Sequence, residues 1–185
     1  MKSKEELCGI IDALGALSVE EICLVSKELS LLRNITPLTF HSVKDLCADA
    51  EKEHLIAAVS WEEIENLEMD EISYYILGPN AFPEIPFELS EVIDILQIEE
   101  REVDLSKVAS RFSRNLHKRI KNLEIKVDSI DQAKVNPKDL ENLEQRYSDI
   151  LNQYYDYSFW LPGDMSDIEA EIQVLSSRIE ALKPA

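Results

Sequence analysis

The spacing of apolar residues in the second half of the chain constrains its fold more than any other feature. Between Leu105 and Ile130, apolar residues recur at intervals of three or four, with a mean of about 3.6, the period of an α-helix. Two further stripes of this kind run from Leu140 to Tyr157 and from Ile168 to Leu182. Because each stripe gives a helix one apolar face, these faces must be covered by neighbouring helices. Residues 104–185 are therefore predicted to form a long-helix hairpin or bundle with coiled-coil-like packing.

The first half carries helix signals of another kind, namely capping residues. Ser3 with Glu6 and Ser18 with Glu21 have the spacing of capping boxes, in which two side chains satisfy free backbone N–H groups. Thr36 followed by Pro37 is typical of a third helix start. Three helices are therefore predicted, over residues 4–14, from 19 to about 33, and over 37–52.

Two short apolar runs follow these helices. The runs HLIAAVSW (54–61) and EISYYILG (71–78) have strand length, and the second is rich in aromatic and β-branched residues. They favour an antiparallel hairpin. A short helix after Ser60 is the alternative, because Ser60 and Glu63 also have the spacing of a capping box.

Three helices followed by a two-stranded hairpin resemble, in element order, a winged helix-turn-helix over residues 4–78. The resemblance implies that residues 37–52 form the recognition helix. Prolines at 79, 83 and 86 then indicate an extended segment. The expected organisation is a winged-helix-like unit at 1–78, a Pro-rich acidic linker with a short helix at 79–103, and a helical bundle at 104–185. The fold class is mainly α.

The amino-acid composition limits the cellular environment and the cysteine chemistry that we expect for this chain. The chain has 19 Lys and Arg against 37 Asp and Glu, a formal net charge of -18. No apolar run is long enough to span a bilayer and no signal peptide is recognisable, so a cytoplasmic protein without membrane contact is expected. Cys8, Cys23 and Cys47 have spacings that favour neither disulfides nor zinc.

No motif for phosphate binding, metalloprotease or hydrolase chemistry occurs, and only four glycines are present. His41 and Asp45 are read as a helix-surface pair, since no nucleophile accompanies them. Glu65, Glu68 and Asp70 are read as a solvated acidic face and not as a cation site. Neither catalytic, cofactor-binding nor metal-binding residues are predicted, and the chain is not expected to be an enzyme.

A basic segment, RFSRNLHKRIKNLEIKV (111–127), stands out in this acidic chain. Arg111, Arg114, Lys118 and Lys121 recur at helical spacing and form one row. Three interpretations stay open: charge pairing within the molecule or between subunits, an acidic protein partner, or nucleic acid. The net charge disfavours nucleic acid, and residues 61–100, with twelve acids and no base, directly precede the row.

The apolar stripes of the last two helices provide a candidate association surface. Its members are Leu143, Tyr147, Ile150, Tyr154, Tyr157, Trp160, Ile172 and Ile179. The aromatic residues near Trp160 are either a plug at a helix corner or a hot spot for a partner. The leading hypothesis is a nonenzymatic protein-protein interaction protein, an assembly or regulatory subunit. It would self-associate through its C-terminal helices as a homodimer or larger complex. The alternative is a winged-helix DNA-binding regulator that dimerises through the same helices.

Overall fold

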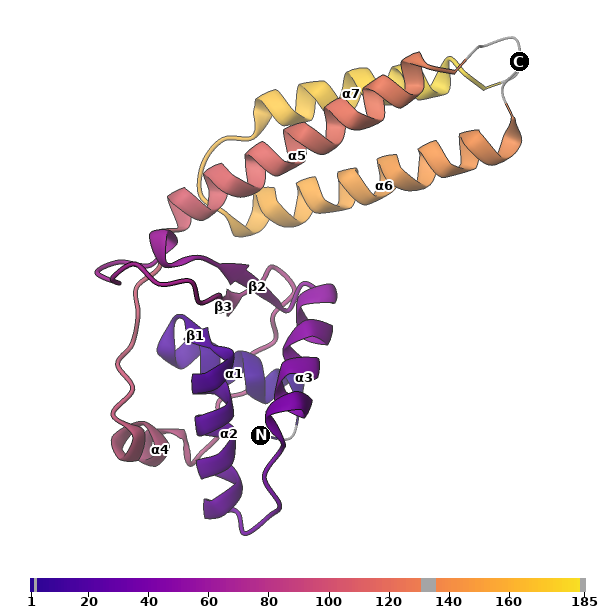
Figure 1. Cartoon of the computed structure of the whole chain (residues 1–185). Helices are drawn as coiled ribbons and strands as arrows, with labels where there is room; N and C mark the ends of the chain where they lie inside the picture. The colour runs from indigo at the N-terminus through magenta and orange to yellow at the C-terminus, as the bar shows by residue number, and fades with distance from the viewer. Residues whose placement is uncertain (2, 131–135, 184–185) are drawn as a thin grey trace. The chain divides into compact units, whose positions relative to one another are not determined.

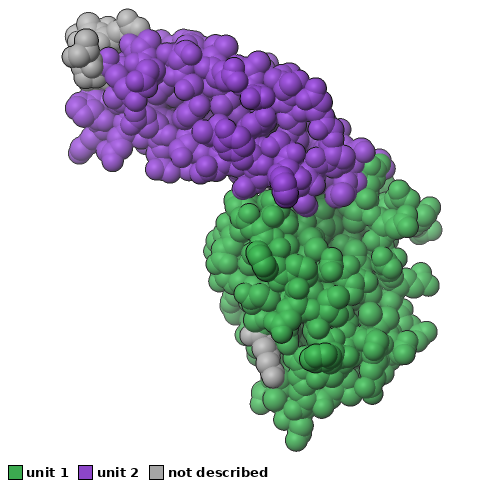
Figure 2. Space-filling model, turned by 180° about the vertical axis from the view of Figure 1, so that it is seen from behind, with its two compact units in different colours: residues 1–104 green, residues 105–185 purple. Residues whose placement is uncertain are grey.

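The computed structural model describes residues 1, 3–130 and 136–183. It is mainly helical with a small antiparallel sheet, as the sequence predicted, and the sheet has a third strand in addition to the expected hairpin (Figure 1). The chain divides into two compact units, residues 1–104 and 105–185, which Figure 2 colours green and purple. Among the described residues, none of the helices has both the length and the apolar character needed to cross a membrane.

The described residues of the first unit form four α-helices, a 3-10 turn and the sheet. Its elements are, in order, α1 (Lys4–Leu14), β1 (Leu17–Ser18), α2 (Val19–Leu32), α3 (Phe40–Lys52), β2 (Ile56–Val59), η1 (Trp61–Glu63), β3 (Tyr74–Leu77) and α4 (Leu89–Leu96). Ser3 and Ser18 cap the first two helices as predicted. The third helix starts later than expected, because Thr39 is its cap and accepts a hydrogen bond from the Ser42 N–H at 3.1 Å.

The strand pattern and the capping-box pattern between residues 54 and 78 both correspond to elements of the structure. Strands β2 and β3 pair antiparallel, with Ile56 opposite Leu77 and Val59 opposite Tyr74. Glu63 also accepts a hydrogen bond from the Ser60 N–H at 3.0 Å, which closes the one turn of η1. The third strand, β1, lies on the other side of β3, so the strand order is β1-β3-β2.

Residues 79–103, expected to be a linker, belong to the first compact unit. Leu89 and Val92 of α4 lie in the same core cluster as the buried faces of α1, α2 and α3. The Glu84 N–H donates to the Glu5 carbonyl at 2.9 Å, and the Arg101 N–H donates to the Leu14 carbonyl at 2.9 Å. The segment is held because it supplies both an apolar helix face and polar partners for α1.

The described residues of the second unit form a bundle of three helices, α5 (Leu105–Asp128), α6 (Pro137–Trp160) and α7 (Ser166–Glu180), in which each helix contacts the other two (Figure 1). The predicted stripes meet in its interior, where the buried residues are Val108, Leu116, Ile120, Leu123, Val127, Leu143, Ile150, Ile168, Ile172, Leu175 and Ile179. Most of the stability of a helix in a protein comes from packing of its apolar face, so this shared interior stabilises all three.

Candidate interaction surface on helix α5

Charge is divided unequally between the two units. Residues 1–104 contain 7 Lys and Arg and 24 Asp and Glu, a formal net charge of -17. Residues 105–185 contain 12 and 13, a net charge of -1. Helix α5 alone has seven Lys and Arg against two acids, Glu124 and Asp128. The second unit therefore presents a basic helix although it is nearly neutral.

The two acidic residues of α5 both form ion pairs with one basic residue of α7. Arg178 lies 3.6 Å from the Glu124 carboxylate through its Nη1, and its Nη2 contacts the Asp128 carboxylate. Further along the same side, the His117 Nδ1 lies 2.8 Å from the Glu171 Oε2. Charges where α5 meets α7 are thus matched locally, and the remaining basic residues of α5 lie elsewhere on the helix.

The predicted basic row is largely exposed. Arg114, Lys118 and Lys121 are exposed, while Arg111 is half-buried with its guanidinium 4.6 Å from the centre of the Phe112 ring. The Arg114 Nε donates to the Ser110 carbonyl at 3.1 Å. Across the described ranges, no carboxylate forms an ion pair with Arg114, Lys118 or Lys121. These three side chains can therefore bind an external anionic surface.

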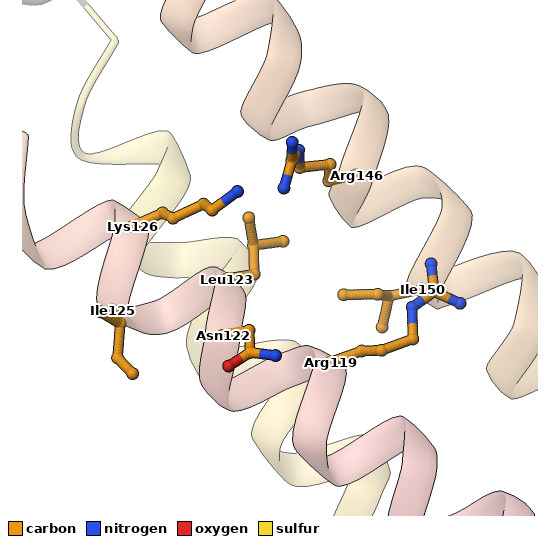
Figure 3. Close-up of a pocket in the computed structure, with 7 residues that line it drawn as sticks. All are labelled: Arg119, Asn122, Leu123, Ile125, Lys126, Arg146 and Ile150. Atoms are coloured by element: carbon orange, nitrogen blue, oxygen red, sulfur yellow. The ribbon is translucent and has the colours of Figure 1, made fainter.

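A groove between α5 and α6 adds a second group of cations that sequence reasoning missed (Figure 3). The groove has a volume of about 440 Å3. The side chains of Lys126 and Arg146 extend toward each other from the two helices, above Leu123, and Ile150 lies beside Arg119 (Figure 3). Arg119 lines the same groove and donates to the Gln153 side chain. We call this the α5–α6 groove.

Electrostatically, the α5–α6 groove favours anions. Within the part of the chain that the structure describes, none of its three cations forms an ion pair, and Arg146 instead donates to the Asn142 amide oxygen at 2.6 Å. Lys126 and Arg146, which extend toward each other, repel one another, and a bound carboxylate would relieve that repulsion. Leu123 and Ile150, only 3 % and 2 % exposed, form an apolar floor beneath them.

The predicted association surface lies mostly inside the bundle. Leu143, Ile150, Tyr157, Ile172 and Ile179 are all buried. Tyr147, Tyr154 and Trp160 are half-buried. These stripes are covered by the other helices of the same chain, so they offer little surface to a second copy. The physical reason is that three stripes suffice to close a core within one chain.

The aromatic cluster forms a plug at one end of α6. The ring of Phe112 on α5 lies 4.7 Å from that of Tyr157 and 5.7 Å from that of Trp160, both edge-on. Burial raises the pKa of the Tyr157 hydroxyl, since the phenolate would lose its solvation. Of the aromatic residues in this region, Phe159 is 94 % exposed and faces solvent.

Among the described residues, the side chains considered as catalytic or metal-binding candidates do not come together in one site. His41 lies 3.4 Å from Asp45 on the exposed surface of α3. Cys8 and Cys47 are buried, and burial raises the pKa of the Cys47 thiol to about 12, so it stays protonated and weakly nucleophilic at neutral pH. Among the described residues, no three His, Cys, Asp or Glu side chains are grouped to hold a metal ion.

The groove could have been found only in part from the sequence. Arg119 and Lys126 are seven residues apart, so they share one face of α5. That spacing is readable, but the placement of Arg146 beside them depends on how α6 is aligned against α5. No local pattern specifies that alignment between two separate helices.

Together, fold and surface define a class: a mainly helical protein of two compact units, whose second unit presents a basic helix face and a cationic groove. The chain belongs to a family of unknown function, DUF7109, whose model matches residues 5–177. Comparisons with curated proteins and with solved structures found no match.

Proposed function

We propose that this chain is a nonenzymatic interaction protein, an assembly or regulatory subunit that self-associates. The basic surface of α5 contacts the acidic first unit of a second copy. The observation that carries the proposal is the division of charge. One unit has a net charge of -17, and on the other Arg114, Lys118 and Lys121 are exposed and form no ion pair with any described residue. Complementary surfaces on one chain allow two copies to make the same contact twice and so close a dimer.

The overall charge of -18 does not prevent such a contact. At physiological salt, charges separated by more than about 8 Å are largely screened, so a local match between opposite patches outweighs distant repulsion. Charge complementarity also guides encounter and selects the partner. The buried stripes of α6 and α7 are not required, because the association uses side chains that already face solvent.

Reversal of charge on the exposed row tests the proposal. Lys118→Glu combined with Lys121→Glu should convert a dimer to a monomer, because both substituted side chains would repel the acidic unit. The measurement is molar mass by light scattering during size-exclusion chromatography, over a range of protein concentrations. Circular dichroism should show unchanged helicity, since both lysines are exposed.

A matched control uses the same charge change on the first unit. Lys27→Glu with Lys44→Glu alters two exposed lysines of α2 and α3 and should leave the dimer intact. Wild-type protein with the mass of one chain at every concentration would contradict the proposal. Equal loss of dimer in both double variants would contradict the role of α5.

DNA binding remains the second candidate, supported by the exposed row on α5 and by the resemblance in element order. Helix α3 gives it little support: Lys52 is paired with Asp49 at 3.0 Å and His41 faces Asp45. A DNA-binding protein should retard duplex DNA at low salt and lose affinity steeply as salt rises. We expect no retardation, and salt-sensitive retardation abolished by Arg114→Glu would favour the alternative.

A further inference from the structure

We propose that the α5–α6 groove of one copy binds residues 82–88 of a second copy. This inference rests on the proposed self-association and names the two surfaces that meet. The segment, with sequence FPEIPFE, belongs to the acidic first unit. It combines apolar side chains with the exposed carboxylate of Glu84, the two kinds of group that the groove accepts.

The segment exposes its apolar side chains to an unusual degree. Phe82, Ile85 and Phe87 are 80 %, 56 % and 102 % exposed, although large apolar side chains usually lie inside. Large exposed apolar surface in a soluble protein commonly marks an interaction site. Within the described ranges, more than half of the surface of each of these three residues is left uncovered.

The segment is also fixed in place before any partner binds. Residues 81–86 are in neither helix nor strand, and Pro83 and Pro86 fix their own backbone angles. It is anchored at two points. The Glu84 N–H donates to the Glu5 carbonyl at 2.9 Å, and Glu88 accepts from Arg33 through Nε at 3.0 Å and Nη2 at 2.8 Å. A pre-ordered segment loses little conformational entropy on docking.

The groove complements the segment in polarity and in size. Arg119, Lys126 and Arg146 surround an apolar floor, so an apolar side chain can enter while a neighbouring carboxylate meets the cations. Glu84 is exposed and lies between Phe82 and Ile85 in the sequence. The volume of about 440 Å3 falls within the range of sites that enclose small ligands or side-chain clusters.

The second copy is the occupant we commit to, because the chain itself carries the complementary charge and the exposed apolar groups. Each copy has one groove and one segment, so two copies exchange both contacts and leave neither surface open. The groove also borders the basic row on α5, and the two surfaces can therefore act together in one interface.

Two single variants of the full chain test the contact. Phe87→Ser removes an apolar side chain from the segment, and Arg146→Glu reverses one charge in the groove. We expect each to raise the dimer dissociation constant about tenfold or more, as loss of an interface anchor does. Phe159→Ser is the control, because Phe159 is equally exposed but lies on α6 outside the contact, and it should leave the constant unchanged.

Exchange of the charges gives a sharper result. Glu84→Arg alone should weaken the dimer, and Glu84→Arg together with Arg146→Glu should restore most of the affinity, since the opposite charges again face each other. A double variant weaker than both single variants would show that Glu84 and the groove do not meet.

A peptide separates this inference from the proposed function. A labelled peptide with the sequence of residues 80–90, titrated with the full chain and followed by fluorescence anisotropy, reports the groove without any need for dimers. Binding to wild-type protein that is lost with Arg146→Glu supports the contact. Binding that persists with Arg146→Glu, or no binding, overturns it. The molar mass of the wild-type chain independently decides whether it self-associates.

Discussion

Arg101 holds the end of the first unit against the start of α2. Its guanidinium contacts the Glu21 carboxylate through two hydrogen bonds of 2.6 and 3.0 Å, and it donates to the Ala16 carbonyl at 2.9 Å. It also lies 5.2 Å from the centre of the Tyr74 ring. Glu21 at the same time accepts from the Ser18 N–H at 2.9 Å. One carboxylate therefore caps a helix and anchors a segment 80 residues away.

Gly15 makes this close approach feasible. Its φ of +77° and ψ of -66° form a γ-turn, closed by a hydrogen bond of 3.0 Å from the Ala16 N–H to the Leu14 carbonyl. A Cβ at this position would lie 1.9 Å from the Arg101 carbonyl oxygen. We expect Gly15→Ala to lower the free energy of unfolding of the first unit by about 2 kcal/mol or more. Urea titration followed by Trp61 fluorescence, in a Trp160→Phe background, measures it.

Gly163→Ala is the comparison for this variant. Gly163 has a φ of +111°, but a Cβ there would meet nothing within 4 Å. Its substitution should cost only the backbone strain and no steric overlap. It belongs to the second unit, so Trp160 fluorescence in a Trp61→Phe background follows it. A Gly15→Ala variant as stable as wild type would refute the close contact between residues 15 and 101.

At the scale of elements, periodic helices could be read from the sequence and short or non-local elements could not. The capping box at Ser18 and the stripes of α5, α6 and α7 are local patterns, and the structure has helices at each. Strand β1 has two residues, too few for any pattern. From the sequence alone, the prolines before α4 indicated a linker. The ion pair of Arg101 with Glu21, which holds this segment to the first unit, joins residues far apart in the chain, so no local pattern predicts it.

The bundle interior yields a prediction for α7. Ile172 is 2 % exposed, and Ile172→Ala should lower the free energy of unfolding of the second unit by about 2–5 kcal/mol through lost burial and a cavity. Trp160 fluorescence during urea unfolding, in a Trp61→Phe background and at one fixed protein concentration, gives the value. The fixed concentration matters because self-association shifts apparent stability.

Val174 provides the matched control on the same helix. It is β-branched like Ile172 but 54 % exposed, so Val174→Ala should change the stability by about 0.5 kcal/mol or less. If both variants lost the same stability, Ile172 would not lie in a packed interior, and the bundle itself would be in question.

At the scale of the whole molecule, the division of charge determines how association should respond to salt. Raising the salt concentration from about 0.1 M to 1 M shortens the screening length from about 10 Å to about 3 Å. We expect the dimer dissociation constant to rise about tenfold or more over this range, since the α5 contact is electrostatic. Sedimentation velocity at several salt concentrations measures the change. Association that strengthens with salt would indicate an interface that is mainly apolar.

The candidate surface was only half visible in the sequence for a related reason. The row of Arg114, Lys118 and Lys121 follows from helical spacing, but whether acids cover it does not. That depends on which helix supplies the counter-charges. In the structure Arg178 of α7 pairs with the two acids of α5, Glu124 and Asp128. These acids therefore do not neutralise Arg114, Lys118 or Lys121.

The attachment of Arg101 also dictates where this protein can be divided in the laboratory. A recombinant fragment that stops at residue 78 would lose the partner of Glu21 and the two core residues of α4, Leu89 and Val92. Its hydrophobic interior would be open on the side where α4 belongs, and such a fragment should precipitate or unfold. Cleavage after Asp104 keeps every one of these attachments, so residues 1–104 form the smallest piece to produce by itself.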